Sequence, residues 1–196
     1  MLHLNFTDFS LFEQLVMPDV VGCPRASISE MAAKVVSEFC EVTQCYREEI
    51  ELEADGNTVD FELVSPQMDA SVIGIYSAVS NNKELLPGDY TAHSSDVVRF
   101  SAAPDNNVTL MLILKPNINA KSAPSGIINR WADTIASGVR YRLMAMPDKP
   151  WTDPQLASFY HKSFQTDSLR ISADVVNQFS VVRTGRAKRN QSFYGV

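Results

Sequence analysis

The stretch GVRYRLMAMPDKPWTDPQLASFYHKSF, residues 138–164, determines how this chain folds, because it contains the end of one helix and the start of another. Its first half is rich in good helix formers, and Pro147 and Pro150 cannot continue a helix. Thr152 or Asp153 then offers a side-chain cap, and the proline that follows suits a first helical turn. A connection this short makes the two helices antiparallel neighbours. The sequence therefore predicts a helical hairpin at the core.

Further helices are predicted on both sides of this hairpin. Ser27 and Glu30 form a capping box ahead of apolar residues at helical spacing, which predicts an amphipathic helix over residues 28–44. A shorter amphipathic helix is expected around residues 8–16. Ser125 can cap the helix that ends in the hairpin.

Gly138 lies within the apolar stripe of that helix, where a glycine costs about 1 kcal/mol in helix propensity. We therefore expect another helix to approach closely at this position. The last helix is predicted from residue 153 to about residue 180.

Residues 46–116 have a different character, with β-branched and aromatic residues between turn signals. Apolar residues alternate with acids over 49–53 and 59–63, and Asp55-Gly56 between them predicts a β-hairpin. Further strands are predicted over three ranges, 72–79, 97–102 and 108–114.

The predicted fold class is α+β: an antiparallel bundle of three main helices, with a small inserted antiparallel sheet or partial barrel and an extended C-terminal tail. Residues 1–182 form one domain, with its helical core in residues 1–45 and 122–182 and the β insertion in residues 46–116. Residues 183–196 form the tail.

Charge is spread unevenly along the chain, whose net charge is −6. Residues 183–196 hold four basic and no acidic residues, which leaves 13 basic against 23 acidic residues, a net charge of −10, in the remainder. A body this acidic is a poor candidate for gripping nucleic acid, because affinity for phosphates comes mainly from Lys and Arg.

The basic tail has three interpretations: contact with nucleic acid, docking on a partner protein, or a solvated end. Its aromatic residues favour a protein pocket. The candidate docking residues are Arg183, Arg186, Lys188, Arg189, Phe193 and Tyr194.

Neither an enzyme nor a cofactor is expected. No phosphate-binding glycine loop, nucleophile elbow or dinucleotide fingerprint is present, and the three histidines lack the spacing of a helical zinc site. The odd number of cysteines and the lack of an export signal predict free thiols, and no metal site is expected. The sequence contains no run of 18 or more apolar residues, so no membrane span is expected.

Three blocks of the sequence resemble the bacteriophage head–tail connector family, the ring-forming adaptors typified by tail tubular protein A. They are GCPRASISEMAAKVVSEFCEVTQCYREEIE (residues 22–51), VTLMLILKP (residues 108–116) and ASGVRYRLMAMPDKPWTDPQLASFYHKSF (residues 136–164). The last block is the most specific.

The resemblance implies a non-enzymatic structural protein of the virion neck, present in the host cytoplasm during assembly. Such adaptors form a ring of about twelve copies around the DNA channel, bind the portal protein and present a surface to the downstream tail or nozzle protein. Double-stranded DNA passes through the lumen without specific binding, and no membrane is involved. A different neck or tail-completion ring protein, or less favourably a nucleic-acid-binding module, is the alternative.

The family has no catalytic residues to carry over, and the matching blocks imply packing roles. Together with the residues that define the hairpin, the expected fold-defining set is Phe39, Cys40, Gly138, Pro147, Pro150, Trp151, Phe159 and Tyr160.

Acidic residues of the predicted strands suggest a second role, since negative charge around a channel repels phosphate. We expect some of them to face the lumen or a neighbouring subunit. The candidates are Glu48, Glu49, Glu51, Glu53, Asp60 and Glu62. The tail from Arg183 to Val196 is expected to become ordered on contact with the portal or the adjoining tail protein.

Overall fold

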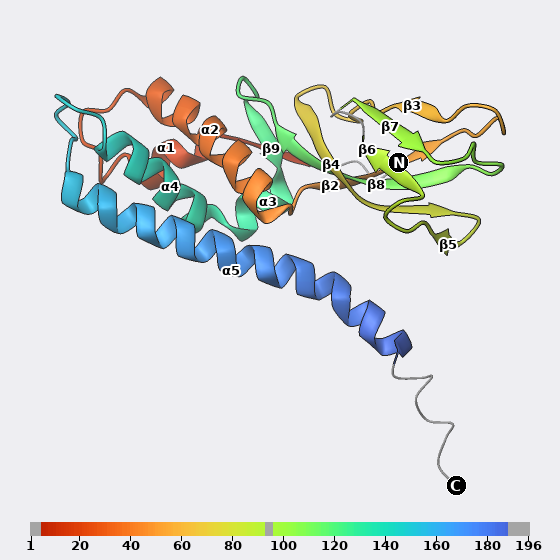
Figure 1. Cartoon of the computed structure of the whole chain (residues 1–196). Coiled ribbons are helices and arrows are strands. Elements are labelled where there is room, and N and C mark those ends of the chain that lie inside the picture. The colour runs from red at the N-terminus through yellow and green to blue at the C-terminus, as the bar shows by residue number, and fades with distance from the viewer. Residues whose placement is uncertain (1–4, 93–95, 188–196) are drawn as a thin grey trace, which may run out of the picture.

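The computed structural model describes residues 5–92 and 96–187 of the chain, with side chains as far as Val176. It is a mixed α/β structure in which the helices and a small two-stranded sheet gather at one end and the other two sheets at the other (Figure 1). The predicted three-helix bundle with a small inserted sheet is wrong, because the described residues form five helices and three antiparallel sheets. The strand-rich segment buries enough apolar residues of its own to be a major part of the fold.

The helical end is built around three helices. They are α2 (Arg25–Thr43), α4 (Ala132–Met144) and α5 (Pro154–Ala187), with the shorter α1 (Leu11–Val16) and α3 (Ser125–Arg130) beside them. The predicted hairpin is confirmed, since α4 and α5 pack together across the short proline-containing connector. Asp153 caps α5 as expected: its Oδ1 accepts hydrogen bonds from the backbone N–H groups of Gln155 at 3.0 Å and Leu156 at 2.9 Å.

Prolines, rather than serines, precede two of the other helices. Pro24 is the N-cap of α2 and Pro124 that of α3, and neither helix has a side-chain cap hydrogen bond. The capping roles predicted for Ser27 and Ser125 are therefore wrong. Both prolines hold extended backbone, with ψ of 137° and 127°, and the helices begin at the next residue.

Two expected helix boundaries also differ. The helix predicted from Ser125 to the hairpin is interrupted at Trp131, whose φ of −125° and ψ of 26° separate α3 from α4. The Trp131 ring lies 5.5 Å from the Phe39 ring of α2. The segment predicted as a helix over residues 8–16 begins instead with strand β1 (Phe6–Asp8), which pairs with β9 (Ser122–Pro124).

The other strands form two antiparallel sheets. The four-stranded sheet has the order β2 (Arg47–Leu52), β8 (Val108–Pro116), β4 (Ala70–Ser80) and β5 (Lys83–Glu84). The three-stranded sheet has the order β3 (Asp60–Glu62), β7 (Val97–Phe100) and β6 (Tyr90–Ala92).

The hairpin predicted around Asp55-Gly56 is wrong, because β2 and β3 belong to different sheets. In β2, Ile50 pairs with Leu110 and Leu52 pairs with Val108 of β8. Both partners are fully buried, so this long-range pairing buries more apolar surface than pairing with the short, largely exposed β3.

One apolar core runs through both ends of the molecule. The central strand β8 buries Leu110, Leu112 and Leu114, and α2 packs against both β8 and α4. The close helix approach expected at Gly138 is confirmed: a Cβ there would lie 2.6 Å from Val35 Cγ1 and 2.9 Å from the Phe164 ring. α2, α4 and α5 thus meet at this glycine.

The remaining fold-defining candidates differ in environment. Phe39 and Cys40 are fully buried, while Trp151, in the connector, and Tyr160 are half-buried against the core. Pro147 and Pro150 lie in the connector between α4 and α5. Phe159 is 66% exposed, so it does not pack in the core as expected, and its ring centre lies 5.4 Å from that of Tyr160.

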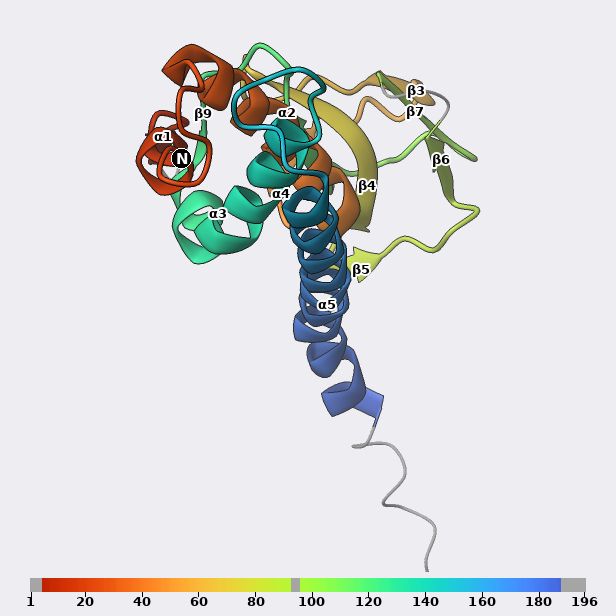
Figure 2. The ribbon, with the colours of Figure 1, turned by 90° about the vertical axis from the view of Figure 1, so that its left-hand side faces the viewer.

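α5 is the longest element, with 34 residues. It leads away from the rest of the molecule toward its C-terminal end (Figure 2). The tail predicted to be extended from residue 183 is therefore helical as far as Ala187. Residues 188–196 lie outside the described part of the chain.

Candidate functional site

The molecule carries its negative charge at the strand end. Residues 46–116, which span β2 to β8, contain 12 acidic and four basic side chains, a net charge of −8 in a chain whose total is −6. The helical end and the C-terminal segment together are therefore slightly positive, at +2. This separation of charge along the molecule does not follow from composition alone. It places the acidic candidates at the strand end.

Three of the six acidic candidates form a strip along β2 and the residue after it. Glu49, Glu51 and Glu53 are exposed and alternate with the half-buried Ile50 and Leu52, as the sequence pattern predicted. Glu51 Oε1 accepts a hydrogen bond from Asn107 Nδ2 at 3.0 Å. The strip has no lysine or arginine among its own residues, and Arg47 lies on the same face of β2.

Glu48 lies on the opposite face of β2 and is half-buried. Its two carboxylate oxygens accept hydrogen bonds from the Tyr46 hydroxyl at 3.1 Å and from Gln67 Nε2 at 3.2 Å. Burial, followed by the nearby Glu48 charge, raises the pKa of Tyr46, so the phenol stays protonated and can donate. Glu48 therefore stabilises the strand end through hydrogen bonds to Tyr46 and Gln67 and is not part of the exposed acidic strip.

The two candidates on β3 behave differently from each other. Asp60 forms a two-pronged ion pair with Arg99 of the adjacent β7, with distances of 2.6 and 2.7 Å, and this pairing offsets its charge. Glu62 is exposed. The six acidic candidates thus lie on two sheets and do not make one cluster.

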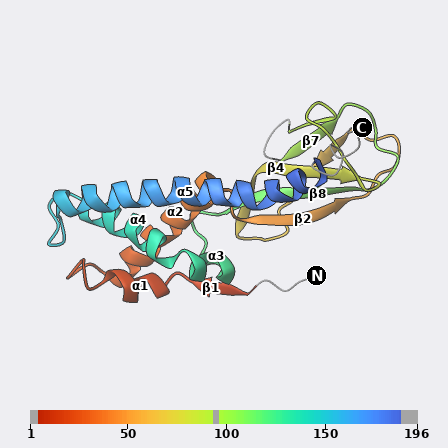
Figure 3. The same cartoon turned by 90° about the horizontal axis from the view of Figure 1, so that it is seen from below.

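β2 is also the edge strand of the four-stranded sheet. Within residues 5–92 and 96–187, no strand pairs with its outer edge, and it lies along the margin of the sheet (Figure 3). Its first residue is held firmly, because Arg47 Nε donates to the Gln44 carbonyl at 2.9 Å and the guanidinium lies 3.6 Å from the centre of the Tyr76 ring. An open edge of this kind is a template for another strand.

The basic docking candidates are located only in part. Arg183 and Arg186 fall in the last turns of α5, beyond the residues whose side chains are described. Lys188, Arg189, Phe193 and Tyr194 lie outside the described residues. What the structure adds is the long helix that precedes them, α5, whose own C-terminal end leads away from the core (Figures 1 and 2).

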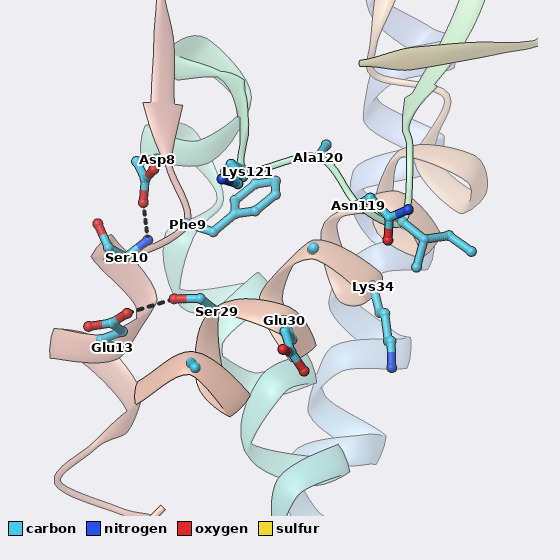
Figure 4. A pocket seen from close by; sticks show the side chains of 13 residues that line it. Asp8, Phe9, Ser10, Glu13, Ser29, Glu30, Lys34, Asn119, Ala120 and Lys121 are labelled. Carbon is cyan, nitrogen blue, oxygen red and sulfur yellow. Dashed lines mark hydrogen bonds between the residues drawn. The ribbon is translucent and has the colours of Figure 1, made fainter. Parts of the chain in front are cut away.

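A groove of about 550 Å³ that sequence reasoning missed lies beside the first half of α2 (Figure 4). It is bounded by β1 and α1, by α2, and by the loop between β8 and β9. Ser29 Oγ donates to Glu13 Oε1 at 2.7 Å, and the Ser10 N–H donates to Asp8 Oδ1 at 2.7 Å, which lowers the pKa of Asp8. Lys34 and Lys121 supply positive charge. No sequence signal could reveal it, because its walls come from three distant segments.

The lining of this groove is polar. It contains carboxylates, lysines and serines, with no histidine or cysteine among the described lining residues. Over the described part of the chain, no three or more His, Cys, Asp or Glu side chains are placed to hold a metal ion. Cys23, Cys40 and Cys45 are free thiols, as predicted.

The helices described here do not include one long and apolar enough to cross a membrane. The features that stand out are therefore surfaces: the acidic strip Glu49–Glu53, the open edge of β2, and the helix that carries the basic segment. Compared with models of protein families and with curated proteins, the sequence matches none.

Proposed function

We propose that this chain is a head-to-tail adaptor of a bacteriophage virion, a structural protein that forms a ring beneath the portal. The proposal rests on the three sequence blocks that resemble the connector family. In the fold they become α2 with most of β2, strand β8, and the α4–α5 hairpin. These elements pack on one another, with α2 against β8, α4 and α5. The resembling blocks are thus the central scaffold, rather than scattered surface matches.

The separation of charge supports the same role. An adaptor must let DNA through without holding it, and protein that carries net negative charge around a channel repels phosphate. A strand end with a net charge of −8 suits the wall of such a channel. The exposed Glu53 and Glu62 are the candidates for this wall.

The feature of the structure that best supports the proposal is the length of α5. At 1.5 Å per residue, its 34 residues extend about 50 Å, whereas α4, its main partner, has 13 residues. In an adaptor such a helix can serve as a rigid arm that carries the basic and aromatic segment to another subunit of the assembly.

Native mass spectrometry of the purified chain, with and without purified portal protein, tests the proposal. We expect a complex containing many copies of the chain only when the portal is present. A version that ends at Ala187 is the matched control, and it should stay folded and fail to bind. A portal that gains no mass at any chain concentration would contradict the proposal, as would an enzymatic turnover that is lost on changing one polar side chain.

A further inference from the structure

We propose that the outer edge of β2 binds residues Lys188–Val196 of a second copy of this chain as an added β-strand. The inference rests on the proposed ring in one respect only, namely that copies associate. It assigns the contact between neighbours, which the proposed function leaves open.

The first argument is the open edge. β2 pairs with β8 along all six of its residues, and its other edge has no strand partner within the described residues. Its free backbone N–H and C=O groups can pair with an extended segment, the mode of recognition called β-augmentation. Proteins commonly protect such an edge with charged side chains, proline or a bulge. Arg47–Leu52 has no proline and no bulge, and its protection is charge: three of its six residues are glutamates, which discourage pairing with another acidic strand.

The second argument is charge. Glu49 and Glu51 project from β2 on its exposed face, and Glu53 follows. The segment beyond α5 begins with Lys188 and Arg189 and has no acid. Opposite charges on facing strands stabilise the pairing, whereas two acidic edges repel each other. The edge therefore selects this basic segment over a second β2.

The third argument is length. The nine residues from Lys188 to Val196 span about 30 Å when extended, and the six of β2 span about 20 Å. An antiparallel register with Arg189 opposite Glu51 pairs all six residues of β2 with Lys188–Phe193. It also places Phe193 opposite Arg47, whose guanidinium already stacks on the Tyr76 ring. One opposite-charge pair, Arg189 with Glu51, and the Phe193–Arg47 contact thus occur in one register.

The direction of α5 favours a second copy over the chain's own segment. α5 carries its C-terminal end away from the sheets of its own copy (Figures 1 and 2). A contact that joins the tail of one copy to the edge of the next is head-to-tail, and contacts of this kind form a ring when the rotation between copies closes.

Cross-linking between two full-length variants tests the inference. A Glu51→Cys chain is mixed with an Arg189→Cys chain in the presence of the purified portal protein and oxidised mildly, and the products are separated by mass and digested. We expect a species of twice the chain mass in which a disulfide joins positions 51 and 189. The matched control replaces Glu51→Cys with Glu62→Cys, an exposed glutamate on the other sheet, and should give little product. The wild-type chain controls for the three native thiols.

Each other outcome overturns the inference. Equal cross-linking at positions 51 and 62 would show random collision, and no cross-link at any concentration would show that the edge is not used. A chain carrying both cysteines that cross-links within itself at high dilution would show that its own segment occupies the edge. Portal binding, measured on the same variants by native mass spectrometry, separates the two proposals: variants that bind the portal without the 51–189 link refute only the edge contact.

Discussion

At the scale of single residues, Gly138 is the position where the fold tolerates least. Gly138→Ala would improve helix propensity by about 1 kcal/mol, but the new Cβ would lie 2.6 Å from Val35 Cγ1 and 2.9 Å from the Phe164 ring. Overpacking of this kind costs about 1–3 kcal/mol, so we expect a net loss of stability in urea unfolding. Gly126→Ala in α3 is the control, since nothing lies within 4 Å of its Cβ position. Equal stability of the two variants would show that the three helices do not meet as described.

Asp55 gives the fold a dependence on pH. Its carboxylate accepts hydrogen bonds from the N–H groups of Thr58 at 2.7 Å and Asn57 at 2.8 Å, which lower its pKa to about 2. Because the folded pKa lies below the unfolded value of about 4, the stabilisation is complete above pH 4 and is lost as pH falls toward 2.

We therefore expect Asp55→Asn to lose less stability than the wild type between pH 4 and pH 2. The measurement is the free energy of unfolding in urea at each pH. Glu53→Gln, which removes an exposed carboxylate two residues away, is the control and should follow the wild type. Parallel curves for Asp55→Asn and the wild type would contradict the assignment.

At the scale of elements, the sequence predicted those helices, strands and caps that are determined by residues close together in the chain. The proline connector and the Asp153 cap were predicted, and so were the position of α2 to within a few residues and the strands that became β4, β7 and β8. The pairing of β2 was not, because its partner β8 lies far along the chain and the choice depends on burial of Leu110 and Val108. The exposure of the glutamates of β2 could be predicted because they alternate with apolar residues. The groove beside α2 could not, because its lining residues come together only in the folded chain.

The N-cap of α5 is the element-scale contact most open to measurement. Asp153→Ala removes both hydrogen bonds to the first turn and should lower stability by about 1 kcal/mol in urea unfolding. Asp153→Ser keeps a capping oxygen and should restore most of the loss. If serine were no better than alanine, the connector prolines alone would fix the start of α5.

At the scale of the whole molecule, one core joins two ends that carry different charges. β8 belongs to both, since it is central in the four-stranded sheet and packs against α2. A rigid connection between an acidic strand end and a helical arm suits a subunit that must place one surface toward DNA and another toward a protein partner. If the two ends moved relative to each other, neither surface would be held in place, so the shared core is consistent with the proposed ring.

The placement of charge, rather than its amount, should decide how the assembled protein treats DNA. Glu53→Lys with Glu62→Lys changes two exposed acids of the strand end. Glu30→Lys with Asp174→Lys makes the same change in net charge at the helical end, also at exposed positions. If the strand end lines the channel, every copy in the ring contributes the two new lysines of the strand-end variant to the same lumen. Positive charge concentrated there should retain DNA.

We expect the portal-bound assembly of the strand-end variant to bind linear duplex DNA at low salt. The helical-end variant and the wild type should not, and the binding should weaken steeply as salt rises. Electrophoretic mobility of labelled DNA over a salt series measures both effects. Equal retention by the two variants would mean that net charge alone governs the contact, and the strand end would then lose its place at the channel. Retention by the helical-end variant alone would put the opposite end of the molecule, and the groove beside α2, at the channel wall.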